Sequence, residues 1–70
     1  MNVKQVKQIK QYMLDCLING EHVDDAGEVE LTQLAEDAAS AFDLYDGDDI
    51  PEEVFEMAYQ VSQKWEKMAA

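Results

Sequence analysis

Apolar side chains recur at intervals of three and four residues in three separate segments of this chain, and this spacing predicts three helices. The first segment carries the stripe Val6, Ile9, Met13, Cys16 and Leu17. Because an α-helix turns once every 3.6 residues, such a stripe lies along one face of a helix. Asn19-Gly20 follows it, and glycine accepts the left-handed conformation that ends many helices. We therefore expect a helix over residues 3–19.

The second segment has an inner stripe that is rich in alanine, which allows a neighbouring helix to approach closely. Its members are Leu31, Leu34, Ala35, Ala38, Ala41, Phe42 and Tyr45. Thr32 is a suitable N-cap, because its hydroxyl can accept a hydrogen bond from an amide of the first turn. The pattern predicts a helix over residues 31–45.

The third segment begins at Pro51, which suits the first position of a helix because its missing N–H would be unpaired there. Apolar residues then follow at spacings of four and three, the rhythm of a helix–helix seam: Val54, Ala58, Val61, Trp65 and Met68. A helix is predicted over residues 51–68. The periodicity also predicts that Phe42, Phe55 and Trp65 point into the core.

Together these elements predict an all-α fold, a small antiparallel three-helix bundle that forms a single domain over residues 1–70. A chain of 70 residues with 47% apolar residues has enough material for one core and no more. Residues 20–30 lack helical periodicity and contain Asp24-Asp25-Ala26-Gly27, a sequence that favours a type I turn. A hairpin-like pairing of the flanking Val23 and Val29 is compatible with this turn, but two strands alone are marginal in water, so we expect a loop.

The single cysteine and the hydropathy indicate a cytoplasmic protein. Cys16 has no partner for an internal disulfide and is expected to act as a small buried hydrophobe in a reducing compartment. Lysines precede the apolar stretch Tyr12–Ile18, but Asp15 interrupts it and no cleavage site follows, so we expect no signal peptide. No run approaches the length of a membrane span.

Charge is the feature that bears most on function. The net charge is -11, and of the sixteen Asp and Glu residues all but Glu66 lie between Asp15 and Glu56, a stretch with no Lys or Arg. Such segregation predicts a surface of one sign that attracts cationic partners. The candidate contact residues on it are Glu36, Asp37, Asp43, Asp46, Asp48 and Asp49. Tyr59 lies on the polar side of the third helix among glutamates and is a candidate aromatic contact.

Catalytic and metal sites are not expected. His22, the sole histidine, stands in a loop, and Cys16 lies a helical turn or more from that loop. Both acidic loops fail as EF-hands, because His22 and Gln33 occupy the first and last ligand positions of one loop and Phe42 and Leu44 occupy early ligand positions of the other. The sequence therefore predicts no enzyme, no cofactor and no metal ligand.

The function that these features favour is a non-catalytic protein-interaction module that presents an acidic face to a basic protein or associates with itself through the third helix. The first alternative is a nucleic-acid mimic, since carboxylates one helical turn apart lie roughly 6 Å from each other, near the spacing of phosphates. The second is a small regulator of the helix-turn-helix type, in which Thr32–Ala38 would belong to the first helix. Phosphates would repel the aspartates at the start of its reading helix, so direct binding to nucleic acid is not expected. A purely solubilising role for the charge stays open.

Overall fold

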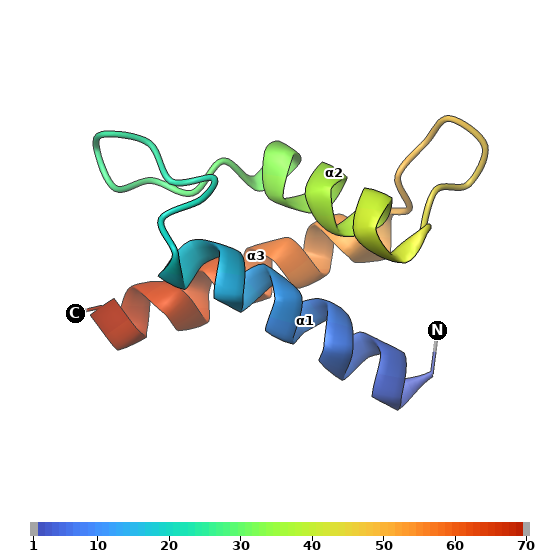
Figure 1. Ribbon diagram of the computed structural model, residues 1–70, viewed down its shortest axis with the longest axis horizontal. Coiled ribbons are helices and arrows are strands. Elements are labelled where there is room, and N and C mark those ends of the chain that lie inside the picture. The colour runs from blue at the N-terminus through green and yellow to red at the C-terminus, as the bar shows by residue number, and fades with distance from the viewer. Residues whose placement is uncertain (1, 70) are drawn as a thin grey trace.

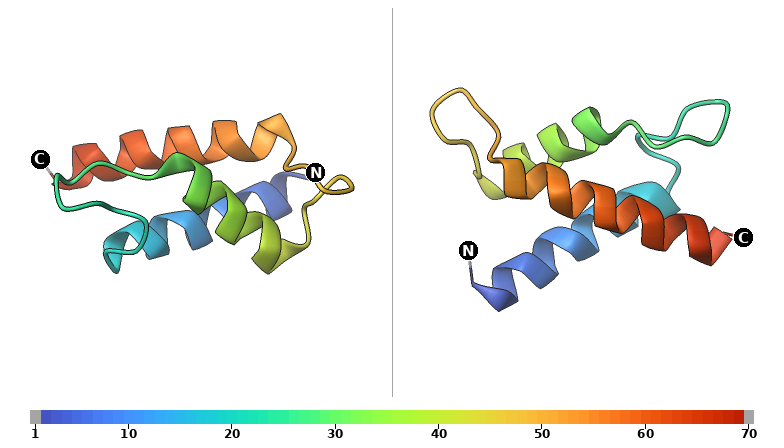
Figure 2. Two further views of the ribbon diagram at one scale, coloured as in Figure 1. Left: turned by 90° about the horizontal axis from the view of Figure 1, so that it is seen from above. Right: turned by 180° about the vertical axis from the view of Figure 1, so that it is seen from behind.

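The computed structural model describes residues 2–69 and confirms the all-α three-helix bundle (Figure 1). The helices are α1 (Val3–Ile18), α2 (Leu31–Phe42) and α3 (Glu52–Ala69). The chain reverses direction at each loop, and α2 packs across both α1 and α3, which cross each other obliquely (Figure 2). Residues 2–69 contain no β-strand beyond two isolated bridges.

Both ends of α1 follow from local hydrogen bonds. The Asn2 side chain caps the helix, because its Oδ1 accepts a hydrogen bond of 2.8 Å from the Gln5 amide. At the other end Gly20 adopts φ +81°, and its amide donates to the carbonyl of Leu17. The next amide, of Glu21, donates to the carbonyl of Cys16 at 2.9 Å. The chain is therefore folded back against the end of α1, and the predicted stop at Asn19-Gly20 is correct to within one residue.

The predicted bounds of α2 were wrong at its C-terminal end. The helix ends at Phe42 because Asp43 adopts the left-handed conformation, with φ 55° and ψ 55°. Aspartate tolerates this conformation better than most residues, and the amides of Asp43 and Leu44 both donate to the carbonyl of Ala39. Tyr45 therefore lies outside the helix and is 42% exposed, not buried in the core.

The predicted N-cap of α2 was also wrong. Glu30 occupies the cap position, without a hydrogen bond from its side chain, and Thr32 lies in the first turn. The Glu30 amide donates to the carbonyl of His22 at 2.8 Å. This bond fixes the backbone at residue 30, so the helix begins at Leu31 regardless of the Thr32 hydroxyl.

The core is built around the closely packed inner face of α2. Fully buried side chains come from all three helices: Ile9, Met13, Leu17, Leu34, Ala35, Ala38, Ala39, Val54 and Ala58. The predicted alanine stripe is confirmed at Ala35 and Ala38, whereas Ala41 is exposed and Ala39 takes its place. The stripe is displaced because α2 packs on two helices at once, and the residues that face both are buried most completely.

The edges of the core are less buried than the periodicity predicts. Phe42, Phe55 and Trp65 are half-buried and pack against the core rather than inside it. Leu31 and Met68 were expected to face inward, but they are 37% and 58% exposed because each stands at the outer end of its helix.

The two loops are ordered by short backbone pairings. In the first loop Val23 and Val29 form a single antiparallel bridge, and the predicted turn is confirmed by a 2.9 Å bond from the Gly27 amide to the Asp24 carbonyl. In the second loop Asp46 and Asp49 exchange backbone hydrogen bonds of 2.8 and 3.1 Å. Within residues 2–69, no helix is both long enough and apolar enough to cross a membrane.

The alanine face of α2 supplies a test of the packing. Replacement of buried Ala38 by leucine should lower the free energy of unfolding by about 1–3 kcal/mol, because three added carbons must fit where the helices are in contact. The matched control is Ala41→Leu in the same helix, where the exposed position should change the free energy by less than about 0.5 kcal/mol. Urea unfolding measures both. Equal effects would show that α2 is not packed closely at Ala38.

Candidate functional site

The predicted acidic surface is extended rather than compact. Glu36 is exposed on α2, and Asp43, Asp46, Asp48 and Asp49 are exposed in the loop that follows α2. The two loops lie at opposite ends of α2 (Figure 1). The carboxylates therefore follow the side of the molecule that α2 and its flanking loops form. In the part of the chain that the structure describes, no lysine forms an ion pair with any of them.

The second loop concentrates three of these carboxylates in a tight turn. The reciprocal bonds between Asp46 and Asp49 close the turn, and Gly47 adopts φ +65°, which favours glycine. Asp46, Asp48 and Asp49 are all exposed. The backbone thus holds three negative side chains on a projecting turn.

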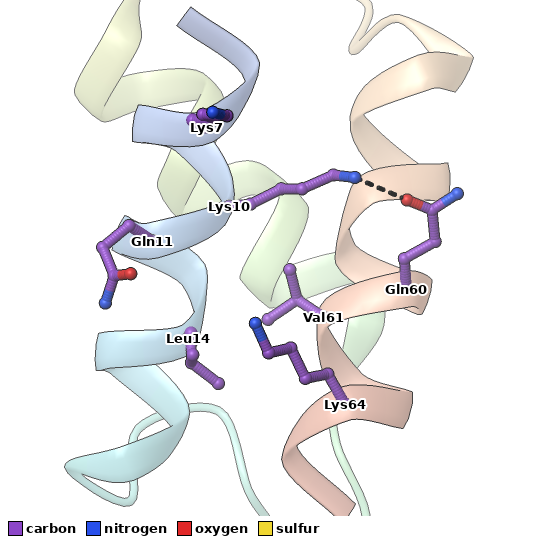
Figure 3. A pocket seen from close by; sticks show the side chains of 7 residues that line it. All are labelled: Lys7, Lys10, Gln11, Leu14, Gln60, Val61 and Lys64. Atoms are coloured by element: carbon purple, nitrogen blue, oxygen red, sulfur yellow. Dashed lines mark hydrogen bonds between the residues drawn. The ribbon is translucent and has the colours of Figure 1, made fainter. Parts of the chain in front are cut away.

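Three of the five lysines lie on the opposite side of the molecule. Lys7, Lys10 and Lys64 line a cleft of about 400 Å³ between α1 and α3, with Leu14 and Val61 among its apolar residues. Figure 3 shows α1 and α3 on either side of this cleft with α2 behind it. The Lys10 ammonium reaches across and donates a hydrogen bond of 2.8 Å to Oε1 of Gln60. These positive charges therefore face away from α2 and do not neutralise the acidic surface.

Tyr59 is exposed, as its position on the polar side of the third helix predicts. Its side chain is 45% exposed, and its hydroxyl accepts a hydrogen bond of 2.8 Å from Nε2 of the Gln63 side chain. It lies between two shallow hollows, one lined by Glu52 and Glu56 and the other by Glu28 and Glu66. Neither hollow includes a residue of the second loop, so Tyr59 and that loop occupy separate parts of the surface.

The sequence predicted Asp37 as part of the acidic surface, but its carboxylate is turned toward α1 and the first loop. Its Oδ1 accepts a hydrogen bond of 2.7 Å from the Tyr12 hydroxyl, and its Oδ2 accepts one of 2.7 Å from Nε2 of His22. The Cys16 thiol lies 3.8 Å from the same Oδ2. The carboxylate thus joins α1, the first loop and α2, and the pair with His22 is the only ion-pair contact within residues 2–69.

The structure also corrects the expected separation of Cys16 and His22. The Cys16 sulfur, a His22 ring nitrogen and an Asp37 carboxylate oxygen all lie within 4.8 Å of one another. They come together because the chain folds back after α1 and His22 adopts φ 60°. The sequence carried one signal for this, the nearness of both residues to the glycine that ends α1. We name these three residues the Cys–His–Asp cluster.

Hydrogen bonding and burial perturb the acidities of this cluster. The hydrogen bonds from His22 and Tyr12 lower the pKa of the Asp37 carboxyl below its ordinary value. Burial, together with the negative charges of Asp37 and Glu21, raises the pKa of the Cys16 thiol to about 11. The hydrogen bond to Asp37 raises the pKa of Tyr12. The thiol is therefore protonated near neutral pH, and the arrangement supplies no activated thiolate for nucleophilic catalysis.

Known proteins provide no guide to these features. The chain matches no protein-family model, no curated protein and no solved structure. Its function has to be inferred from the charge distribution and from the chemistry of the clustered side chains.

The hydrogen bonds of Asp37 predict a stabilising role for its charge. Asp37→Asn should lower the free energy of unfolding at about pH 7 by about 1–3 kcal/mol, because an amide cannot accept hydrogen bonds at both terminal atoms. The matched control, Glu36→Gln, makes the same chemical change at the exposed neighbouring position and should stay within about 0.5 kcal/mol. Urea unfolding in the presence of a chelator measures the free energy of unfolding of both variants.

The pH dependence of this difference provides the check. A carboxyl group whose pKa is lowered by folding stabilises the folded chain above its unfolded pKa, here near 3.8, and loses this effect as the pH falls below it. The free energies of unfolding of the wild type and Asp37→Asn should therefore converge as the pH falls below about 3.8 and through the lowered pKa of the folded chain. A difference that persists unchanged in acid would contradict the role of the charge.

The raised pKa of Cys16 predicts slow alkylation. At about pH 8 the thiolate fraction of a thiol with pKa about 11 is about 100-fold lower than that of an ordinary thiol with pKa 9.0, and burial slows access further. Iodoacetamide, followed by mass spectrometry in the presence of a chelator, should modify the folded chain at least about 100-fold more slowly than the chain in urea. Similar rates in the two states would show that the thiol is neither buried nor held protonated.

Proposed function

We propose that this protein is a non-catalytic interaction module that docks the acidic surface formed by α2 and the second loop on a basic protein. The observation that carries the proposal is the separation of the charges. Glu36, Asp43 and the carboxylates of the second-loop turn are exposed and lack lysine partners. The cleft that Lys7, Lys10 and Lys64 line lies between α1 and α3, on the side away from α2 (Figure 3).

The physical argument is that unpaired surface charges act together. A carboxylate that is already paired with lysine contributes little to the field that an approaching molecule meets, whereas several unpaired charges of one sign add. A net charge of -11 on 70 residues also repels acidic macromolecules and other copies of the chain. A basic protein surface is the partner that this field attracts most strongly.

Self-association through the third helix receives less support. Val54, Ala58 and Val61, the first three residues of the seam that the periodicity predicts, are buried within the chain's own core. Of the remaining seam residues Trp65 is half-buried and Met68 exposed. A dimer would have to use other residues, so the acidic surface is the better candidate for an interface.

Of the two alternative functions, nucleic-acid mimicry is better supported than a helix-turn-helix regulator. Mimicry of nucleic acid is favoured by the projecting turn of Asp46, Asp48 and Asp49, which presents closely spaced negative groups. Direct reading of DNA is disfavoured, because α3 would enter the groove behind Glu52 and Glu53 at its N-terminus. We propose a cytoplasmic location because the single cysteine of the chain is buried and forms no disulfide.

A charge-matched pair of variants tests the proposal. In one, Asp43, Asp46, Asp48 and Asp49 become asparagine; in the other, Asp15 and Asp25 become asparagine and Glu21 and Glu66 become glutamine. Both remove four exposed carboxylates, but the second leaves α2 and the second loop intact. The immobilised wild type and the control should retain a basic protein from a lysate of the source cell in low salt, while the first variant should not.

The controls separate docking from its alternatives. Release by moderate salt is expected for an electrostatic contact. Release by added duplex DNA would identify the captured protein as one that binds nucleic acid and would favour mimicry. Equal loss by both variants would show that only net charge matters, and failure of the wild type to retain any basic protein would refute the proposed function.

A further inference from the structure

The Cys–His–Asp cluster has the donor atoms and the spacing of a transition-metal site. Cys16 comes from the last turn of α1, His22 from the turn after it and Asp37 from the middle of α2. Their sulfur, nitrogen and oxygen atoms lie within 4.8 Å of one another. Three ligand types that converge from three elements form a site that no single stretch of sequence provides.

Two of the three distances between ligand atoms are within about 1 Å of those that a tetrahedral ion requires, and the third, between the Cys16 sulfur and a His22 nitrogen, is at most 4.8 Å. With Zn–S near 2.3 Å and Zn–N and Zn–O near 2.0–2.2 Å, ligand atoms at tetrahedral angles lie roughly 3.4–3.6 Å apart. The Cys16 sulfur is already 3.8 Å from Oδ2 of Asp37. The His22 nitrogen is 2.7 Å from this oxygen and would have to move away by roughly 0.7 Å.

The donor set selects the kind of ion. A thiolate and an imidazole favour zinc and its neighbours over magnesium or calcium, which prefer oxygen ligands. The thiolate and the carboxylate together carry two negative charges, which balance a divalent cation. On binding, the Cys16 sulfur gives up its proton to solvent. Nε2 of His22 loses the hydrogen that it donates to Asp37, so the neutral imidazole carries its one hydrogen on Nδ1 and Nε2 faces the ion.

A hydrogen bond from Tyr12 orients the Asp37 carboxylate. The Tyr12 hydroxyl donates a 2.7 Å hydrogen bond to Oδ1 of Asp37, which leaves Oδ2 directed at Cys16 and His22. The Tyr12 ring is held in turn by an edge-to-face contact with Phe42, with ring centroids 5.6 Å apart. Hydrogen bonds of this kind orient the ligands of many metal sites.

The backbone presents His22 in a conformation that most residues avoid. Its φ of 60° lies in the left-handed region, where histidine is tolerated better than branched residues. The bond from the Glu30 amide to the His22 carbonyl holds this conformation in place. The imidazole is 20% exposed and the Asp37 side chain 32%, while Cys16 is buried, so two of the three ligands can be reached from solvent.

An ion in this position would reinforce the weakest part of the bundle. Both α1 and α2 pack chiefly on α3 and share the smallest contact with each other. Domains below about 70–80 residues commonly depend on a disulfide or a metal for stability, and the one cysteine here forms no internal disulfide.

From these observations we infer that Cys16, His22 and Asp37 bind one Zn²⁺ ion that ties α1 and the first loop to α2, with a fourth position open to water. The inference is independent of the acidic surface, which uses other carboxylates. It also replaces the sequence-based expectation that the chain has no metal ligand, which depended on the assumed distance between Cys16 and His22.

The test is titration of the full chain, freed of metal by a chelator and then desalted, with Zn²⁺ alone in a calorimeter. We expect one equivalent to bind and the melting temperature to rise. Cys16→Ala and His22→Asn should each weaken binding more than about 100-fold, and Tyr12→Phe should weaken it about 10-fold or more. Asparagine is chosen at position 22 because it tolerates the left-handed backbone. Titration with Co²⁺ should give a thiolate-to-cobalt charge-transfer band and the intense visible bands of tetrahedral coordination.

The control is the variant with Asp43, Asp46, Asp48 and Asp49 changed to asparagine, which should bind one equivalent like the wild type. Circular dichroism without metal must show that each variant keeps its helices; a ligand variant that does not is replaced by Asp37→Asn, which should weaken binding to the same extent. Binding that survives in Cys16→Ala, that is lost in the control, or that takes many equivalents would overturn the inference. A cobalt complex without the thiolate band would also overturn it.

Discussion

The close approach of α2 to the other two helices is the constraint on which the rest of the structure depends. Ala35, Ala38 and Ala39 are fully buried, and such small side chains allow backbones to come near one another. From the same helix, the short side chain of Asp37 reaches Tyr12 and Cys16 of α1. A larger residue at Ala38 would separate the helices and with them the members of the Cys–His–Asp cluster.

Periodicity was sufficient to predict the helices but not the environment of every residue. The first and third stripes located α1 and α3 to within one residue, because the burial of these helices follows the helical repeat. The end of α2 could not be predicted in this way, since it depends on the left-handed backbone of Asp43, a residue that also fits a helix. Asp37 was expected to face outward because a simple helical stripe has one inner side, whereas α2 packs on two helices and so has a wider one.

The candidate site was only partly within reach of the sequence. The exposure of Glu36, of the second-loop carboxylates and of Tyr59 follows from their polar positions. The Cys–His–Asp cluster depends instead on tertiary structure: the chain must fold back at Gly20, His22 must adopt a positive φ, and α2 must return beside α1. No spacing within one segment encodes these three events together.

The carboxylates of the chain stand in two different environments, and this explains how the two proposed sites fit on so small a domain. Most carboxylates are exposed along α2 and the loops, where water and salt screen each charge. Their electrostatic fields add at the surface of a charged partner that approaches them. Asp37 is half-buried and held by three side chains, so its charge acts over a few ångströms and on the fold itself. A divalent ion there would be balanced by the Cys16 thiolate and the Asp37 carboxylate, so the charge of the acidic surface would be left unchanged. The two sites therefore place independent demands on the same helix, whose inner edge forms one and whose outer side carries the other.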